Sequence, residues 1–227
     1  MKFPPNSTIP VASVCLRNAV EALADAKFAL REAFAHLTWY RKHCDQSEEW
    51  VGIHFARFFT DDTALRLYSA GEHLANAIVN ALEVEKRDLD KYRRKNRIGQ
   101  QVVVGHYLLN SQPESQITAA VKRLVLSKDW LKTIRYRNDW VHNQPPTLEG
   151  VGIVYERRNR WVISGRGRHL PVGGGDAPKH TIDNLLGFIQ PSLLLLNKVL
   201  SDVMRSYVEL LRGTGITVTE EGLSVSL

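Results

Sequence analysis

Cysteine is nearly absent from this sequence of 227 residues. Its two cysteines, Cys15 and Cys44, belong neither to a Cys-x-x-Cys pair nor to a spacing typical of zinc ligands. This scarcity argues against a disulfide scaffold or a zinc module as the basis of the fold. It fits a protein that works in a reducing compartment such as the cytosol.

Long hydrophobic runs are also missing. The longest leucine run, 193–196, is far shorter than the roughly 20 apolar residues that span a bilayer. Near the amino terminus, prolines occupy positions where a signal peptide needs an apolar run, and Arg17 interrupts the segment that follows. We therefore expect a soluble, cytoplasmic protein without a membrane partner.

Signatures of several enzyme classes are absent. The sequence has no His-Glu-x-x-His zinc motif, no Gly-x-Ser-x-Gly nucleophile elbow and no Gly-x-Gly-x-x-Gly loop. Three glycines at 173–175 lack the Lys and Ser/Thr of a phosphate-binding P-loop. His36, His43 and Cys44 lie near one another but lack a supporting carboxylate pattern. We expect neither a metal nor a cofactor.

Acidic residues are outnumbered by basic ones, 24 against 30, which gives a formal net charge of +6. Clustered cations gain affinity for a polyanion by displacing counterions from its phosphates, although such a charge can also serve solubility alone. The strongest cluster is KRDLDKYRRKNR, residues 86–97. Its candidate RNA contacts are Arg93, Arg94, Lys95 and Arg97; a solvated helix end is the alternative.

Helical periodicity covers most of the chain. Apolar residues recur in steps of three and four across 16–37, which predicts a first helix over about 10–43. The most regular pattern, across 182–210, is typical of a central bundle helix or of one shared with a second subunit. Pro191 is expected to kink or restart this last helix.

Further helices are predicted between these two. A short aromatic helix is expected at about 50–59, and the next runs from a cap at Thr60, Asp61 or Asp62 to about residue 86. Another opens at Pro113 and Glu114 and ends near Ser127. A last one carries the motif described below and halts at Pro145 and Pro146.

Residues 150–165 change from helical to alternating character. VGIVYE and RWVISG are rich in β-branched and aromatic residues and flank RRN, which predicts a β-hairpin. Arg157, Arg158 and Arg160 at its tip are further candidate RNA contacts. A Gly- and Pro-rich loop follows, and the last residues form a short strand or a loose tail.

The expected fold class is mainly α. We predict one domain over 1–227, an up-and-down helical bundle with a small β-hairpin insertion at about 147–180, before the last long helix.

The segment TIRYRNDWVHNQPP, residues 133–146, concentrates hydrogen-bonding groups at a helix end. Asn138 and His142 are four residues apart and share a helix face. Arg135, almost two turns before His142, shares it too, whereas Arg137 lies to one side with a side chain long enough to reach round. The double proline keeps His142 close to a loop and to solvent.

The other side of this helix is expected to be apolar, with Trp140 and Val141 facing the core and fixing the helix. On an earlier helix, Glu72 is a candidate to orient the motif arginine. An interhelical ion pair or an exposed polar face is the alternative for Glu72.

The hexapeptide RNDWVH resembles the R-x4-6-H motif of the HEPN superfamily (higher eukaryotes and prokaryotes nucleotide-binding), in which a polar residue, often Asn, commonly follows the arginine. Arg137 and His142 are separated by four residues, and Asn138 takes the polar position. Arg135 satisfies the looser six-residue spacing, and Asn138 favours Arg137. The resemblance covers the predicted helices of 10–146 and the final helix.

This resemblance implies a homodimer that brings two motif helices together across a two-fold axis. Many HEPN proteins are metal-independent endoribonucleases, often toxins or effectors in prokaryotic defence systems. RNA is then the substrate, and an antitoxin or another regulatory protein is a further partner. Arg137 and His142 are the implied catalytic residues. The predicted supporting residues are Asn138, Asp139, Arg135 and Glu72.

The residue types suit this chemistry. An RNA 2′-OH attacks the adjacent phosphate when a base removes its proton and a donor stabilises the charge that develops. Histidine exchanges protons near neutral pH, and arginine offers forked donors to phosphate. Two alternatives stay open. One is a non-catalytic HEPN-type module that binds RNA, a nucleotide or a protein; the other is a plain bundle in which the motif arises by chance.

Overall fold

The structure is a computed structural model that describes residues 8–45, 49–93, 99–142, 146, 148, 162–164, 167–169, 179–213, 216–219 and 222–225. Its helices are α1 Ile9–His43, α2 Glu49–Ala81, α3 Lys86–Arg93, α4 Gln100–Ser111, α5 Gln116–Val125, α6 Lys128–His142 and α7 Ile182–Gly213. Its strands are β1 Val162–Ser164, β2 Gly167–His169, β3 Ile216–Thr219 and β4 Gly222–Val225. The expected mainly helical bundle is confirmed.

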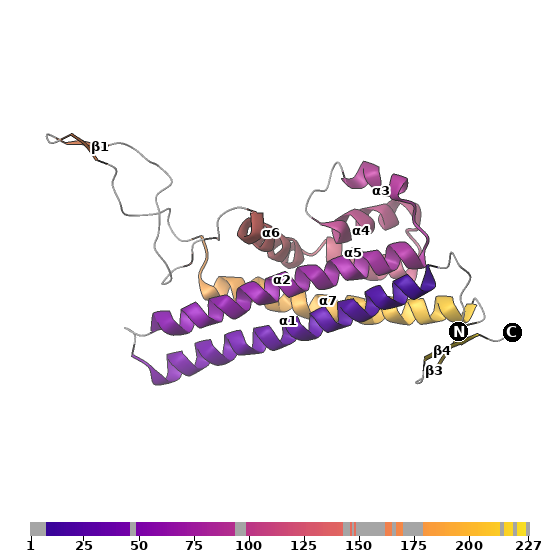
Figure 1. The fold of residues 1–227 in the computed structure, drawn as a ribbon, viewed down its shortest axis with the longest axis horizontal. Coiled ribbons are helices and arrows are strands. Elements are labelled where there is room, and N and C mark those ends of the chain that lie inside the picture. The colour runs from indigo at the N-terminus through magenta and orange to yellow at the C-terminus, as the bar shows by residue number, and fades with distance from the viewer. Residues whose placement is uncertain are drawn as a thin grey trace.

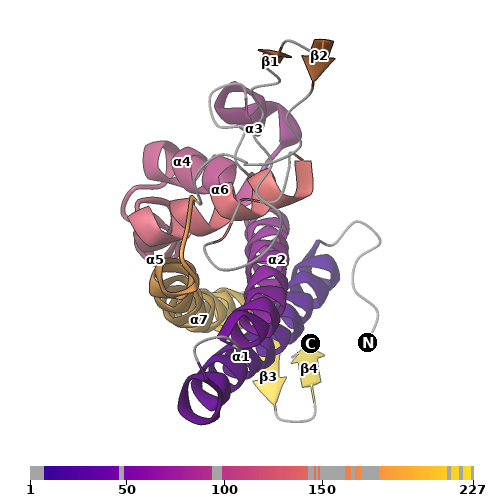
Figure 2. The ribbon, with the colours of Figure 1, turned by 90° about the vertical axis from the view of Figure 1, so that its left-hand side faces the viewer.

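Three long helices form the body of the bundle. α1, α2 and α7 run along the long axis of the molecule, with α1 antiparallel to the other two (Figure 1). The shorter helices α3 to α6 lie on one side of these three (Figure 2). Among them, α4 and α6 pack on α2, while α5 and α6 pack on α7. The motif helix α6 is therefore held by two long helices.

The seam of α1 is a seven-residue repeat. Alanine occupies every seventh position from Ala12 to Ala33 and leucine every seventh from Leu16 to Leu37, and all of these side chains are buried. Such a repeat keeps one stripe facing a partner helix, and its alanines allow a close approach to α2. The periodicity was predicted, but Val20, an apolar residue within the predicted pattern at 16–37, is 41% exposed.

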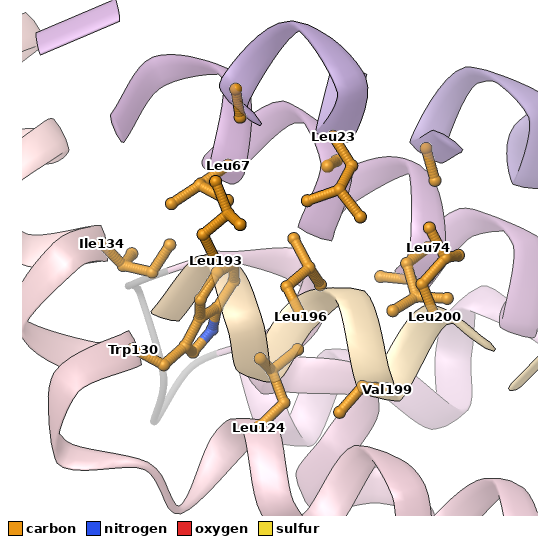
Figure 3. Packing of buried hydrophobic residues seen from close by; sticks show 14 of the residues in the cluster. Leu23, Leu67, Leu74, Leu124, Trp130, Ile134, Leu193, Leu196, Val199 and Leu200 are labelled. Atoms are coloured by element: carbon orange, nitrogen blue, oxygen red, sulfur yellow. The ribbon is translucent and has the colours of Figure 1, made fainter. Parts of the chain in front are cut away.

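The core lies where α6 meets the long helices. Leu67 of α2 lies close to Leu193 of α7, and Trp130 and Ile134 of α6 close this side of the cluster (Figure 3). The indole of Trp130 would come within 2.9 Å of a Cβ atom at position 71, where α2 has a glycine. Gly71 therefore lets α6 approach α2 closely.

The predicted division of α2 is wrong. A single helix runs from Glu49 to Ala81, and the Thr60 and Asp61 caps are absent because both residues lie inside it. The Thr60 and Thr63 hydroxyls donate to the carbonyls four residues earlier, at 2.6 and 2.7 Å, which satisfies them within the helix. The chain turns after α2 at Glu83, whose φ is 51°, and α3 begins at Lys86.

Two other helices differ from expectation. No helix was predicted at α4, where the structure has twelve helical residues. Pro191 was expected to kink or restart the last helix; it does not restart it, because α7 runs through Pro191 as one helix. The proline lacks an N–H group, so only the carbonyl of Gly187 loses its helical donor.

The predicted β-hairpin is not seen among the described residues. The sequence pattern predicts that VGIVYE pairs with RWVISG, whereas in the structure β1 pairs with β2 and Val162 lies opposite His169. β2 comes from the stretch expected to be an irregular loop, and the predicted first strand, 151–156, lies outside the described residues. At the carboxyl end, β3 and β4 form an antiparallel pair instead of one strand or a loose tail.

Within the described ranges, none of the helices combines the length and the apolar character needed to cross a membrane.

Candidate functional site on helix α6

The inward side of α6 fixes the position of the motif. Trp130, Thr133, Ile134 and Tyr136 are its buried residues. Thr133 Oγ1 lies 2.9 Å from Ser192 Oγ of α7, which adds a polar contact to the apolar packing. The buried residues recur in steps of three and four, so they occupy one stripe of the helix.

Arg137 lies against α2. Its guanidinium carbon is 3.8 Å from the centroid of the Tyr68 ring, and Nη1 donates a 3.0 Å hydrogen bond to Asn138 Oδ1. Its Nε atom is buried without a hydrogen-bond partner in the described part of the chain. A stack on one face and a bond at one end fix the plane of a guanidinium. Arg137 and Asn138 are both half-buried.

Glu72 mainly caps another helix. Its Oε1 accepts a 2.7 Å hydrogen bond from the backbone N–H of Gln100, the first residue of α4. Burial raises the pKa of Glu72, opposed first by the amides of Gln100 and Gln101 and then by the charge of Arg137. Glu72 therefore acts on the predicted arginine through its charge, while it accepts hydrogen bonds from the start of α4.

His142 is the last residue of α6, and its side chain is exposed. The preceding turn differs from expectation. Val141, which was expected to face the core, is 40% exposed, so it does not anchor the helix. Trp140 does, because it is half-buried and donates a hydrogen bond to Asp61 of α2.

Asp61 joins α2 to the end of α6, a role that sequence analysis missed. It accepts hydrogen bonds from the Tyr136 hydroxyl and from Trp140, and its Oδ2 lies 3.5 Å from Arg57 Nε. Arg57 in turn donates a 3.0 Å hydrogen bond to the carbonyl of Pro146. We call Arg57, Asp61, Tyr136 and Trp140 the Asp61 network.

The charge of Asp61 is balanced by these partners. Burial raises the pKa of Asp61, whereas Tyr136, Arg57 and Trp140 lower it. Burial and the nearby carboxylate raise the pKa of Tyr136 far above its usual value, so its hydroxyl remains a donor. The only sequence signal was the four-residue spacing of Arg57 and Asp61, which is too common to identify such a network.

Arg135 and Asp139 are exposed, and they lie on a different side of α6 from Arg137. They border a cavity of about 440 Å³ between α6 and the beginning of α7, which we call the α6–α7 pocket. Neither Arg137 nor His142 lines it. The lining residues are Asp129, Lys132, Arg135, Tyr136, Asp139, His180, Asn184, Gly187 and Phe188.

Comparison with models of known protein families, with curated proteins and with solved structures finds no match to this chain. The resemblance of the motif to that of HEPN proteins therefore stays a prediction from the sequence.

Of the seven basic residues predicted to contact RNA, the structure describes Arg93. Arg94, Lys95, Arg97, Arg157, Arg158 and Arg160 lie outside the described residues. The Arg93 side chain is 40% exposed, lies 3.7 Å from Asp90 and donates a 3.2 Å hydrogen bond to Gln100.

Among the residues that the structure places, no group of three or more His, Cys, Asp or Glu side chains could hold a metal ion.

Proposed function

We propose that this chain is a metal-independent endoribonuclease of the HEPN type that acts as a homodimer, with Arg137 and His142 as its catalytic residues. One observation carries the proposal. A single helix holds an arginine in a fixed orientation, stacked on Tyr68 and bonded to Asn138, and ends five residues later on an exposed imidazole. A phosphate-binding fork and a proton-transfer group are the two parts that metal-free RNA cleavage requires.

The geometry of α6 favours a site made by two copies. Residues five apart on an α-helix point about 140° away from each other around its axis. Arg137 accordingly faces α2, whereas His142 is exposed at the helix end. A two-fold axis beside the end of α6 would set His142 of one protomer towards Arg137 of its partner. The proposal therefore requires a dimer.

Exposed aromatic side chains support a partner surface next to this end of α6. Trp50 and Phe58 of α2 are 57% and 64% exposed. Phe58 follows Arg57, which contacts the chain just beyond α6 through Pro146. Large exposed apolar groups on one helix are consistent with a surface that another protein covers.

In the proposed reaction the phosphorus forms a bond to the 2′-oxygen and loses its bond to the 5′-oxygen of the next nucleotide. One His142 removes the proton of a 2′-OH group, and that oxygen attacks the adjacent phosphorus. Arg137 donates to the phosphate oxygens as negative charge develops on them. The partner's His142 gives a proton to the departing 5′-oxygen. The products carry a 2′,3′-cyclic phosphate and a 5′-hydroxyl group.

The roles of the two arginines give a direct test. We expect Arg137→Ala to lower the rate of RNA cleavage about 100-fold, the usual loss when one donor to a developing oxyanion is removed. Arg135→Ala should change that rate less than about threefold and weaken RNA binding instead, because Arg135 lies on the pocket side. Single-turnover cleavage of a labelled RNA measures both effects, with thermal unfolding as the control for folding. The reverse pattern would assign catalysis to Arg135.

A non-catalytic binding module is the second candidate. The observation that favours it is the α6–α7 pocket, which brings Lys132 and Arg135 together away from both proposed catalytic residues. Growth on expression separates the candidates. An active cytoplasmic toxin or defence effector, normally restrained by an antitoxin or another protein, slows its host, and His142→Ala relieves this effect. A binding module would affect host growth equally as wild type and as His142→Ala.

A further inference from the structure

The α6–α7 pocket has the size of a small-molecule site. Its volume of about 440 Å³ falls within the roughly 300–1,000 Å³ of known ligand pockets. One wall comes from α6 and the other from the first turns of α7, together with His180 just before it. Because both walls are helices of the bundle, the cavity is preformed.

The floor of the pocket is aromatic and fixed. The rings of Tyr136, His180 and Phe188 meet edge to face, with centroids 5.8 to 6.2 Å apart. The Tyr136 hydroxyl is bound to Asp61, which holds its ring in place. Burial and then Lys179 lower the pKa of His180, while Asp139 opposes them, so the neutral imidazole is favoured. A flat apolar ring fits such a floor better than a charged group does.

The rim carries charge of both signs. Lys132 and Arg135 are exposed and three residues apart on α6, and neither lies within 4.0 Å of a described carboxylate. Two like charges at this spacing repel each other, and a bound anion would relieve the repulsion. Asp129 and Asp139 also line the pocket, so its formal charge balances. This balance suits one phosphate better than a triphosphate.

Gly187 is an independent sign that the space is needed. A glycine inside a helix costs about 1 kcal/mol relative to alanine. Gly52, Gly71 and Gly105 have a steric reason, because an added Cβ would come within 3 Å of a neighbouring side chain. A Cβ at position 187 would meet nothing within 4 Å, so packing does not require this glycine. It lines the pocket, where any side chain would take up volume.

We propose that the α6–α7 pocket binds one nucleoside monophosphate unit, with its base over Gly187 and the aromatic floor and its phosphate between Lys132 and Arg135. Asn184 at the rim can pair with the polar edge of the base. The unit is either a free nucleotide or one residue of an RNA strand. This site goes beyond the ribonuclease proposal, because Arg137 and His142 are not part of it.

Calorimetric titration tests the proposal. Full-length His142→Ala protein, chosen so that RNA is not cut, is titrated with AMP, GMP, CMP, UMP, ATP, inorganic phosphate and a short single-stranded RNA. We expect saturable binding of at least one monophosphate or of the RNA, more weakly for ATP than for AMP and absent for inorganic phosphate. Binding of a monophosphate identifies a free nucleotide as a ligand, and binding of RNA alone identifies the strand.

Position 187 supplies the decisive variant. Gly187→Leu fills the pocket from a helix position with open space, so it should fold and lose more than about tenfold in affinity. Gly213→Leu, at the end of the same helix and also surrounded by open space, is the matched control and should bind as before. Lys132→Ala should weaken binding as well. Equal affinity of Gly187→Leu, equal binding of inorganic phosphate, tighter binding of ATP than of AMP, or no binding of any probe would overturn the proposal.

Discussion

Replacing His142 with alanine is expected to lower RNA cleavage about a thousandfold while the protein stays folded. A positioned acid or base contributes roughly 10²- to 10⁴-fold to a rate, and in the proposed dimer this one residue supplies both groups. The side chain is exposed at the end of α6, so its removal leaves no cavity. Cleavage of a labelled RNA, measured beside the circular dichroism spectrum and the melting temperature, separates a loss of chemistry from a loss of structure.

His43 provides the matched control. It is also an exposed histidine at the last position of a helix, in this case α1. Any general effect of a helix-terminal imidazole on stability or charge would therefore appear in His43→Ala as well. We expect this variant to cleave RNA at the wild-type rate. Equal activity of His142→Ala and wild type would remove His142 from the mechanism.

Asp61→Ala is expected to reduce the free energy of unfolding by about 3 kcal/mol. The carboxylate accepts bonds from Tyr136 and Trp140 and pairs with Arg57, and the side chains of Arg57 and Asp61 are only 17% and 11% exposed. Its removal would leave the buried Tyr136 hydroxyl, the half-buried Trp140 indole and the Arg57 cation without this partner. Urea unfolding, followed by circular dichroism, measures the change.

The neighbouring Asp62 is the control for this variant. Its ion pair with Arg66 lies in the open, where the two side chains are 38% and 47% exposed. Exposed pairs of this kind contribute little, so Asp62→Ala should stay within about 0.5 kcal/mol of wild type. A similar loss in both variants would mean that the Asp61 network does not hold α6 to α2.

The sequence predicts a helix well where contacts between residues close in sequence determine it, and poorly where distant contacts do. α1 and α7 were placed closely because their apolar residues repeat with helical spacing and polar or glycine-containing segments follow them. α4 was missed because it begins with a β-branched run, Val102–Val104, that has no clear period. Those valines are buried, and Glu72 from α2 caps the helix, so distant contacts decide its structure.

The candidate site shows the same limit. The motif itself and the exposure of His142 could be predicted, because both depend on the spacing of residues within one helix. The orientation of Arg137 could not, since it depends on Tyr68 in another helix. Asp61 was interpreted as a cap because a Thr-Asp-Asp sequence is typical of a helix start. The two α6 residues that donate to it, Tyr136 and Trp140, lie 75 or more residues away in sequence.

The most direct test of the proposed function is the chemistry of the products. Purified wild-type protein is incubated with single-stranded RNA in excess EDTA, and the ends of the fragments are identified by mass spectrometry. The proposal predicts cleavage that EDTA does not suppress, with 2′,3′-cyclic phosphate on one new end and a 5′-hydroxyl on the other. Intact RNA, cleavage that EDTA abolishes, or fragments ending in a 3′-hydroxyl and a 5′-phosphate would contradict it.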